Sequence, residues 1–277
     1  MKNTLNVIIT LSVFLIADLA YGQLNREKPA ILDEVGVEEK LGDYIPMDLT
    51  FATSDGDSVT IAELMKDGKP VLLNPLYYEC PTLCGLVLDA VFNVVHDLAW
   101  SPGNEYTIIS YSIDPEENTG HAASKKAEIM EDLERRGADE GWHFLTGSEE
   151  SIKTLSDAVG FKYKYDERTG EYIHLASIML LSPEGKITRY LYGLSMREFD
   201  LRNALYEAAD GQIGSVMERA IMYCFTYDPS SQSYVPVAMN IMKLGGLATM
   251  LILGIFLTIL WRRNSGSSQP PKIEFQE

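Results

Sequence analysis

The sequence predicts an α/β domain with a mixed central sheet flanked by helices, followed by one C-terminal transmembrane helix. Two observations support this fold class. Short apolar runs alternate with helical segments through the middle of the chain, which is typical of consecutive βα units. Near the C-terminus, residues 244–261 carry no charged side chain, and a helix of that length reaches across a bilayer core.

The first half of the domain opens with a predicted hairpin at 46–60, which turns at an Asp-Gly dipeptide. A short helix at 61–66 follows and ends at a second Asp-Gly pair. The apolar run 71–73 lies between prolines, so it suits a buried strand. We expect the next helix at 81–98, because its apolar side chains recur on one face.

The second half continues the alternation of strands and helices. Residues 106–113 and 142–145 are apolar and predict strands, and a charged, exposed helix at 122–136 lies between them. A helix at 148–159 opens with two glutamates, which suit the positive end of the helix dipole.

The domain is expected to close with a hairpin of residues 161–166 and 172–181 across an Arg-Thr-Gly turn. A strand at 186–192 follows, and 197–222 is predicted to be mostly helical. The hairpin makes the sheet mixed. A strand that delivers a cysteine pair to the start of a helix fits a thioredoxin-like architecture, and the sequence indicates neither an internal repeat nor a second domain.

Both ends of the chain predict association with a membrane. Residues 1–22 have the pattern of a cleaved signal peptide, with small residues before the expected cleavage site; an uncleaved N-terminal anchor is the alternative. Residues 241–261 are the predicted transmembrane helix, and two arginines follow it. The positive-inside rule then places the C-terminus in the cytoplasm and the domain on the exported side. The remaining divisions are a linker at 23–40, the thioredoxin-like domain at 41–225, a juxtamembrane segment at 226–240 and a cytoplasmic tail at 262–277.

The charge balance excludes one class of partner. The chain has 40 acidic and 23 basic residues and a net charge of −17. Phosphate binding needs a basic surface, so nucleic acid is excluded as a partner. An acidic surface attracts cationic partners and metal ions, or it serves solubility alone.

The chemistry is expected at Cys80 and Cys84, between a predicted strand and a predicted helix. Pro81 suits the first position of that helix. The positive end of a helix lowers thiol pKa values, and thiolates bind metals or attack disulfides. Three interpretations stay open: a metal site, a redox pair and a structural disulfide. The spacing between the two cysteines is one residue wider than in the Cys-x-x-Cys redox motif, and this wider spacing favours a metal site.

A copper site needs one more ligand than the two cysteines. Soft thiolates favour Cu(I), and one imidazole in addition to the two thiolates completes a three-coordinate Cu(I) site. Zinc would normally take a fourth ligand. His174 is the candidate, because the loop before its predicted strand faces the start of the cysteine helix in a thioredoxin-like sheet. His96 lies three turns along that helix, and we interpret His121 and His143 as structural residues.

Three motifs together resemble the Sco/SenC family over about residues 40–225. They are Cys80-Pro-Thr-Leu-Cys84, the Tyr-Ser-Ile-Asp-Pro sequence that contains Asp114, and His174 followed by Ile-Met-Leu-Leu-Ser-Pro-Glu-Gly. The resemblance implies a thioredoxin-like fold that binds copper, as Cu(I) with Cu(II) as the alternative. It also implies that Cys80, Cys84 and His174 are the ligands and that Asp114 lies beside them. A turn residue before a proline is the other interpretation of Asp114.

The resemblance also implies a function. Family members deliver copper to the dinuclear copper site in subunit II of cytochrome c oxidase, or reduce the cysteines of that site. The expected partners are this subunit or a similar copper acceptor, and an upstream copper donor or thiol reductant. The alternative functions are a thiol–disulfide oxidoreductase, in which Cys80 attacks and Cys84 resolves, and an interaction module that assembles a respiratory complex.

The sequence departs from the family pattern in two places. Asn118-Thr119-Gly120 stand where the family often has Asp-Thr-Pro, and the anchor is C-terminal rather than N-terminal. The segment at Cys224 resembles a bacterial branch, so the expected location is a bacterial inner membrane with the domain in the periplasm. Cys224 itself is interpreted as a buried thiol, an auxiliary copper or redox group, or an intermolecular disulfide partner.

Overall fold

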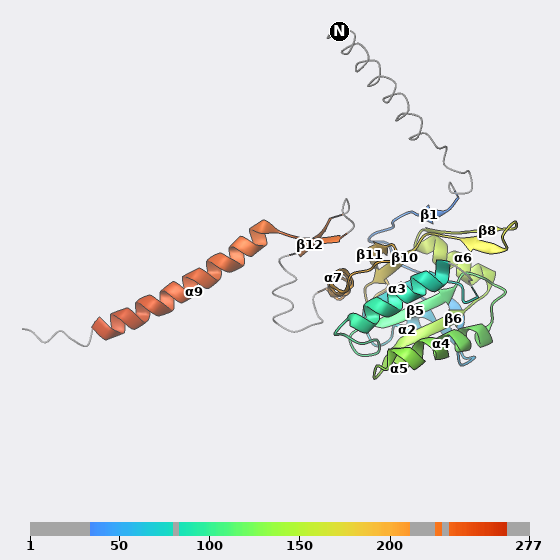
Figure 1. Ribbon diagram of the computed structural model, residues 1–277, viewed down its shortest axis with the longest axis horizontal. Coiled ribbons are helices and arrows are strands. Elements are labelled where there is room, and N and C mark those ends of the chain that lie inside the picture. The colour runs from blue at the N-terminus through green and yellow to red at the C-terminus, as the bar shows by residue number, and fades with distance from the viewer. Residues whose placement is uncertain (1–33, 80–82, 211–224, 229–232, 265–277) are drawn as a thin grey trace, which may run out of the picture.

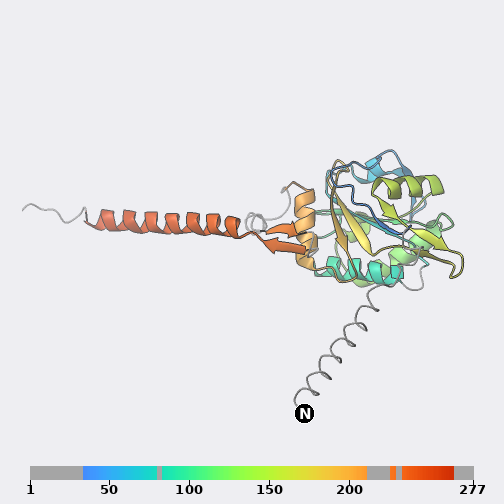
Figure 2. The same cartoon turned by 90° about the horizontal axis from the view of Figure 1, so that it is seen from above.

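The computed structural model describes residues 34–79, 83–210, 225–228 and 233–264. The predicted signal peptide, Cys80, Cys224 and most of the predicted tail lie outside the described residues. Figures 1 and 2 show an α/β domain from which one long helix projects.

Seven strands form the central sheet: β2 (Thr50–Thr53), β3 (Ser58–Thr60), β4 (Val71–Leu76), β5 (Thr107–Ser112), β6 (Trp142–Thr146), β10 (Ser177–Leu181) and β11 (Ile187–Tyr192). Their order across the sheet is β11-β10-β4-β5-β6-β2-β3. The pairs β4–β5 and β5–β6 are parallel, and the other neighbouring pairs are antiparallel. The predicted mixed α/β class is therefore confirmed.

Helices cover both faces of this sheet. They are α2 (Ile61–Leu64), α3 (Leu83–Asp97), α4 (Thr119–Leu133), α5 (Ala138–Gly141), α6 (Glu149–Ala158) and α7 (Glu198–Ala208). One hydrophobic core joins the sheet to α3, α4 and α7, and the other joins it to α2 and α6. Because both faces are covered, β4, β5 and β10 are buried at every residue.

Side-chain caps determine where the helices begin. Thr60 closes a capping box at α2, and the Ser148 hydroxyl caps α6 by accepting the N–H of Ser151. The Asn118 side chain accepts the N–H of Gly120, so α4 begins at residue 119 and not at 122 as predicted.

Strand β4 is longer than predicted, because it runs through Pro75. The ladder between β4 and β10 covers only Val71–Leu73, so the missing N–H of Pro75 breaks no bond on that side. On the other side β4 pairs with β5 up to Leu76 and Ser112. Both strands therefore end at the same level of the sheet.

The predicted strand 172–181 is wrong in its continuity. Its first part is β9 (Glu171–Ile173), which pairs with β8 (Lys164–Asp166) in a separate two-stranded hairpin. Its second part, β10, joins the central sheet beside β4. In the residues that connect β9 to β10, the chain crosses from the outer hairpin to the central sheet. The nearby β7 (Phe161–Lys162) pairs with β1 (Gly36–Val37), which lies inside the segment predicted as a linker.

A second hairpin joins the domain to the C-terminal helix. It consists of β12 (Phe225–Asp228) and β13 (Ser233–Pro236) and packs against α7. The backbone N–H of Tyr234 donates to the buried Asp200 carboxylate at 3.0 Å, and the Tyr234 hydroxyl donates to Glu207 at 2.7 Å. The hairpin is thereby fixed to the domain.

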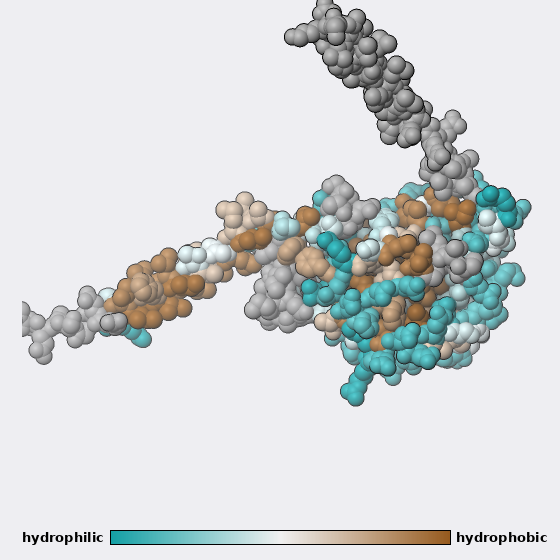
Figure 3. Space-filling view, in the orientation of Figure 1, coloured by the Kyte–Doolittle hydropathy of each residue, from teal (hydrophilic) through white to brown (hydrophobic). Residues whose placement is uncertain are grey.

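Helix α9 (Ala238–Asn264) follows this hairpin. Among the residues that the structure describes, it is the one helix that is long and apolar enough to cross a membrane, over Ala238–Arg262. None of its apolar window is buried, and Figure 3 shows apolar side chains along it. The helix contains the predicted span 241–261.

Candidate metal centre

The cysteine segment leaves the sheet at the carboxyl end of β4. Tyr77, Tyr78 and Glu79 follow that strand, and the chain then reaches Cys80, outside the described residues. Cys84 is the second residue of α3, and its backbone alone is described. It therefore lies in the first turn of a helix, where the dipole favours a thiolate.

The register of the sheet brings His174 to the same edge. Strand β10 runs antiparallel to β4, with Met179 opposite Leu73, so the residues before β10 lie beside the residues after β4. The rings of Tyr77 and Tyr172 meet there, with their centroids 5.6 Å apart. His174 lies in the loop before β10. The prediction that it begins a continuous strand is wrong.

The surroundings of His174 favour a neutral imidazole. Its side chain is buried, and its ring lies 5.6 Å from the ring of Phe161. Burial lowers the pKa of His174. The Leu175 carbonyl lies 3.0 Å from Nδ1 and can only accept, so Nδ1 carries the proton and Nε2 carries the lone pair. A neutral imidazole with that lone pair is the form that binds metals.

Asp114 lies at this edge too, after the end of β5. Its carboxylate accepts the N–H of Glu116 at 2.9 Å, which makes it a turn residue. It also faces the hairpin that leads to His174: burial and the nearby Asp114 charge raise the pKa of Tyr172 to about 12. The position of Asp114 beside the metal ligands stays a prediction.

Glu117 is a buried carboxylate at this edge that the sequence analysis missed. It accepts the backbone N–H of Tyr78 at 2.9 Å and that of Glu79 at 2.8 Å. It also accepts the Ser112 hydroxyl at 2.5 Å. No sequence pattern distinguishes Glu117 from its exposed neighbour Glu116; only the adjacency of β4 and β5 could have indicated it.

The other three histidines have different surroundings. His121 accepts the N–H of Asn118 at 3.1 Å within the cap of α4, and its Nε2 lies 3.4 Å from the Glu79 carboxylate. His96 is exposed near the end of α3. His143 lies near the start of β6, away from the carboxyl ends of the parallel strands, and burial lowers its pKa.

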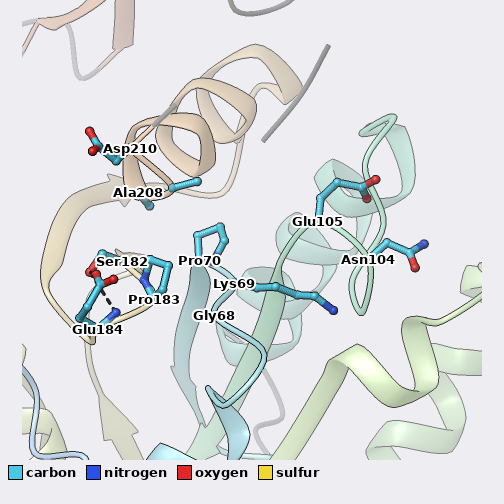
Figure 4. Close-up of a pocket in the computed structure, with 11 residues that line it drawn as sticks. Gly68, Lys69, Pro70, Asn104, Glu105, Ser182, Pro183, Glu184, Ala208 and Asp210 are labelled. Carbon is cyan, nitrogen blue, oxygen red and sulfur yellow. Dashed lines mark hydrogen bonds between the residues drawn. The ribbon is translucent and has the colours of Figure 1, made fainter. Parts of the chain in front are cut away.

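A hollow of about 380 Å³ lies at the opposite edge of the sheet (Figure 4). Its lining includes Lys69 and Pro70, before β4, and Asn104 and Glu105, before β5. The cysteine segment follows the other end of β4, so this hollow is separate from the candidate centre.

Within the described residues, no group of three or more His, Cys, Asp or Glu side chains could hold a metal ion. Cys80 and the Cys84 side chain lie outside the described part of the chain. The described part of the site supplies a neutral imidazole, which suits zinc, copper, iron and nickel, at the edge where the chain enters the cysteine segment.

The fold and this edge define a thioredoxin-like domain with a cysteine pair where a buried strand leads into the first long helix, Cys84 lying in the first turn of that helix. The chain belongs to the SCO1/SenC family, whose model matches residues 38–204. It is 28% identical over 153 residues to the SCO1 protein homolog of Bacillus subtilis (strain 168). The matched residues cover 54% of this chain and 75% of that protein.

The chain is similar to solved structures, the first of which supports the fold. A crystal structure of an Aquifex aeolicus VF5 protein has 28% identity and a TM-score of 0.56, and covers 62% of this chain and 96% of that one. Arabidopsis thaliana ScoI, solved with copper bound, has 21% identity and a TM-score of 0.45, and covers 61% of this chain and 98% of that one.

Proposed function

We propose that this protein is a membrane-tethered copper chaperone. It delivers copper to the dinuclear copper site of cytochrome c oxidase subunit II, or prepares the thiols of that site, and copper is its cargo. The observation that carries the proposal is the buried, neutral His174 imidazole at the edge where the chain enters the segment of Cys80 and Cys84. Membership of the SCO1/SenC family supports it.

The proposed ligands are the thiolates of Cys80 and Cys84 and Nε2 of His174. Two thiolates and one imidazole form a soft, three-coordinate set that suits Cu(I). The hydrogen bond from Nδ1 to the Leu175 carbonyl supports this role, because it fixes the tautomer that presents Nε2 to a metal. A disulfide between the two cysteines removes both sulfur ligands, so copper binding requires the reduced form.

Copper leaves this site by ligand exchange in the proposed mechanism. A thiolate of the acceptor adds to the three-coordinate copper as one of the protein's ligands departs, and the oxidation state of the metal does not change. An upstream copper donor loads the site again, and a thiol reductant restores the cysteines when they have been oxidised. Asp114 lies near Tyr172, in the hairpin that leads to His174, and its charge opposes ionisation of that phenol.

The proposed location is a bacterial inner membrane, with α9 as a single span. The domain lies on the periplasmic side and the C-terminus in the cytoplasm. Trp261 at the end of α9, with Arg262 after it, suits an aromatic belt followed by cytoplasmic positive charge. The predicted signal peptide supports the same orientation.

A thiol–disulfide oxidoreductase is the second candidate function, supported by the position of Cys84 in the first turn of α3. In this case the Cys80 thiolate attacks a disulfide of the acceptor, and one acceptor thiolate leaves. Cys84 then attacks the mixed disulfide and releases the second acceptor thiol. The pair ends as a disulfide, and the acceptor has gained two electrons.

A Cu(I) titration of the reduced full-length chain in detergent, against a competing chelator, tests the proposal. We expect His174→Ala to lower the affinity by at least about 100-fold, more than the loss of an outer hydrogen-bond partner costs. His96→Ala, at an exposed position on the cysteine helix, is the control and leaves the affinity unchanged. If His174→Ala binds as tightly as wild type and both chains reduce an acceptor disulfide, the oxidoreductase function replaces the chaperone. If neither chain binds copper or exchanges thiols, an interaction module remains.

A further inference from the structure

The Glu117 carboxylate is almost completely enclosed, with 7% of the residue exposed. Burying a charge is costly unless hydrogen bonds compensate it. Here three donors do so: two successive backbone N–H groups, from Tyr78 and Glu79, and the Ser112 hydroxyl. Hydrogen bonds to an ionised acceptor are about twice as strong as neutral ones. The carboxylate therefore holds the backbone of this segment firmly.

Glu117 is itself held by the structure around it. Its N–H donates to the Asp114 carbonyl at 3.3 Å in the turn after β5, and the next residue, Asn118, caps α4. Strand β5 ends at Ser112, which is opposite Leu76 at the end of β4. A side chain from the loop after β5 can thus reach the segment after β4 directly.

The two residues that Glu117 holds are the last ones before Cys80 in the chain. The first turn of α4, which follows this loop, contacts the same segment through His121 and the Glu79 carboxylate at 3.4 Å. With two adjacent N–H groups bound to the two oxygens of one carboxylate, the peptide planes at Tyr78 and Glu79 have a fixed orientation.

We infer that Glu117 is a positioning residue for the cysteine pair: its carboxylate fixes the backbone from which Cys80 extends and so holds the two sulfurs in a geometry suited to one metal ion. The inference rests on the proposed function. Glu117 acts through the backbone, and it is not proposed as a ligand.

Glu117→Gln tests the inference, because the amide offers one acceptor where the carboxylate offers two, and its NH₂ group faces a donor. We expect the amides of Tyr78 and Glu79 to exchange hydrogen faster, and Cu(I) affinity to fall about tenfold, equivalent to ~1.4 kcal/mol. Glu116→Gln, at the exposed neighbouring position, is the matched control and changes neither.

Glu117→Asp separates geometry from charge, since it keeps the charge but is one methylene shorter. We expect it to behave like Glu117→Gln; wild-type affinity in Glu117→Asp would overturn the inference. Wild-type affinity in Glu117→Gln, despite faster exchange at the two amides, would overturn it as well. If Glu117→Gln does not fold, the same measurements on Ser112→Ala, which removes one donor to the carboxylate, should give smaller changes of the same sign.

The reduction potential of the cysteine pair distinguishes this inference from the proposed function, because its measurement needs no copper. If the wild-type chain binds no Cu(I), the chaperone proposal fails by itself. A shifted reduction potential in Glu117→Gln, with Glu116→Gln unchanged, would still support Glu117 as a positioning residue. If the wild-type chain binds no Cu(I), an unchanged potential in Glu117→Gln would refute that role.

Discussion

Removal of the Asp200 carboxylate should release the hairpin that joins the domain to α9. Asp200 is buried and accepts three hydrogen bonds: from the Arg197 guanidinium at 2.6 and 2.9 Å, and from the N–H of Tyr234 at 3.0 Å. In Asp200→Ala, the Tyr234 N–H keeps its burial but loses its acceptor. The hairpin then has less to gain from packing on α7.

The size of the effect follows from these contacts. A buried N–H without an acceptor costs about 1–3 kcal/mol. The Arg197–Asp200 ion pair lies within the start of α7 and persists when the hairpin opens, so its loss adds nothing to this local opening. We therefore expect Asp200→Ala to lower the free energy of local opening of the hairpin by about 1–3 kcal/mol, which is roughly a 5-fold to 150-fold rise in the open population.

Hydrogen exchange of the full-length chain in detergent measures this opening, with the Tyr234 amide as the probe. Glu198→Ala is the matched control, because Glu198 lies on the same helix and forms one partly exposed ion pair with Arg202, away from the hairpin contact of Asp200. We expect that control to exchange as wild type does. Equal protection of the Tyr234 amide in Asp200→Ala and Glu198→Ala would refute the proposed fixation of the hairpin.

Three further predictions concern the core, the site and the anchor. Trp142→Ala should lower the free energy of unfolding by about 3–5 kcal/mol, since this side chain is fully buried and donates to Ser110; a denaturant midpoint near that of wild type would contradict this. Asp114→Asn should lower the pKa of Tyr172 from about 12, because a neutral amide no longer opposes the phenolate; an ultraviolet titration, with Tyr172→Phe to identify the transition, would disagree if the pKa stayed the same. A chain that ends at Val237 should move from the membrane to the soluble fraction on ultracentrifugation, and its retention would argue against α9 as the anchor.

Local patterns in the sequence were sufficient to predict most elements of the sheet and the helices. Strands such as the one predicted at 106–113 are buried on both faces, which leaves a short apolar run between turn residues in the sequence. The boundary errors have local physical causes. Asn118 caps α4 earlier than the apolar pattern indicates, and Pro75 is tolerated because the ladder with β10 stops before it.

The division of 172–181 could not be predicted in the same way. β9 and β10 are nearly continuous in sequence, and only the choice of pairing partner, β8 or β4, separates them. That choice depends on contacts between residues far apart in the chain.

The residues of the candidate site also differ in whether the local sequence or a contact between distant segments reveals them. Cys80, Cys84 and His174 were predicted because thiols and an imidazole have distinct chemistry and belong to recognisable motifs. Glu117 was missed because its role depends on one spatial relation, the common end of β4 and β5. Acidic residues are frequent in this chain, so a further glutamate carries no signal until its hydrogen bonds are known.

The short connection between β13 and α9 limits how far from its anchor the domain can bind a partner. One residue, Val237, separates the end of the hairpin from the start of the helix, and the hairpin is bound to α7. The domain therefore has little freedom to swing away from its anchor. If α9 spans a membrane, a partner must come within about one domain diameter of the same bilayer, and a partner that is itself anchored there meets the domain by lateral diffusion in the plane instead of by a search through the surrounding volume.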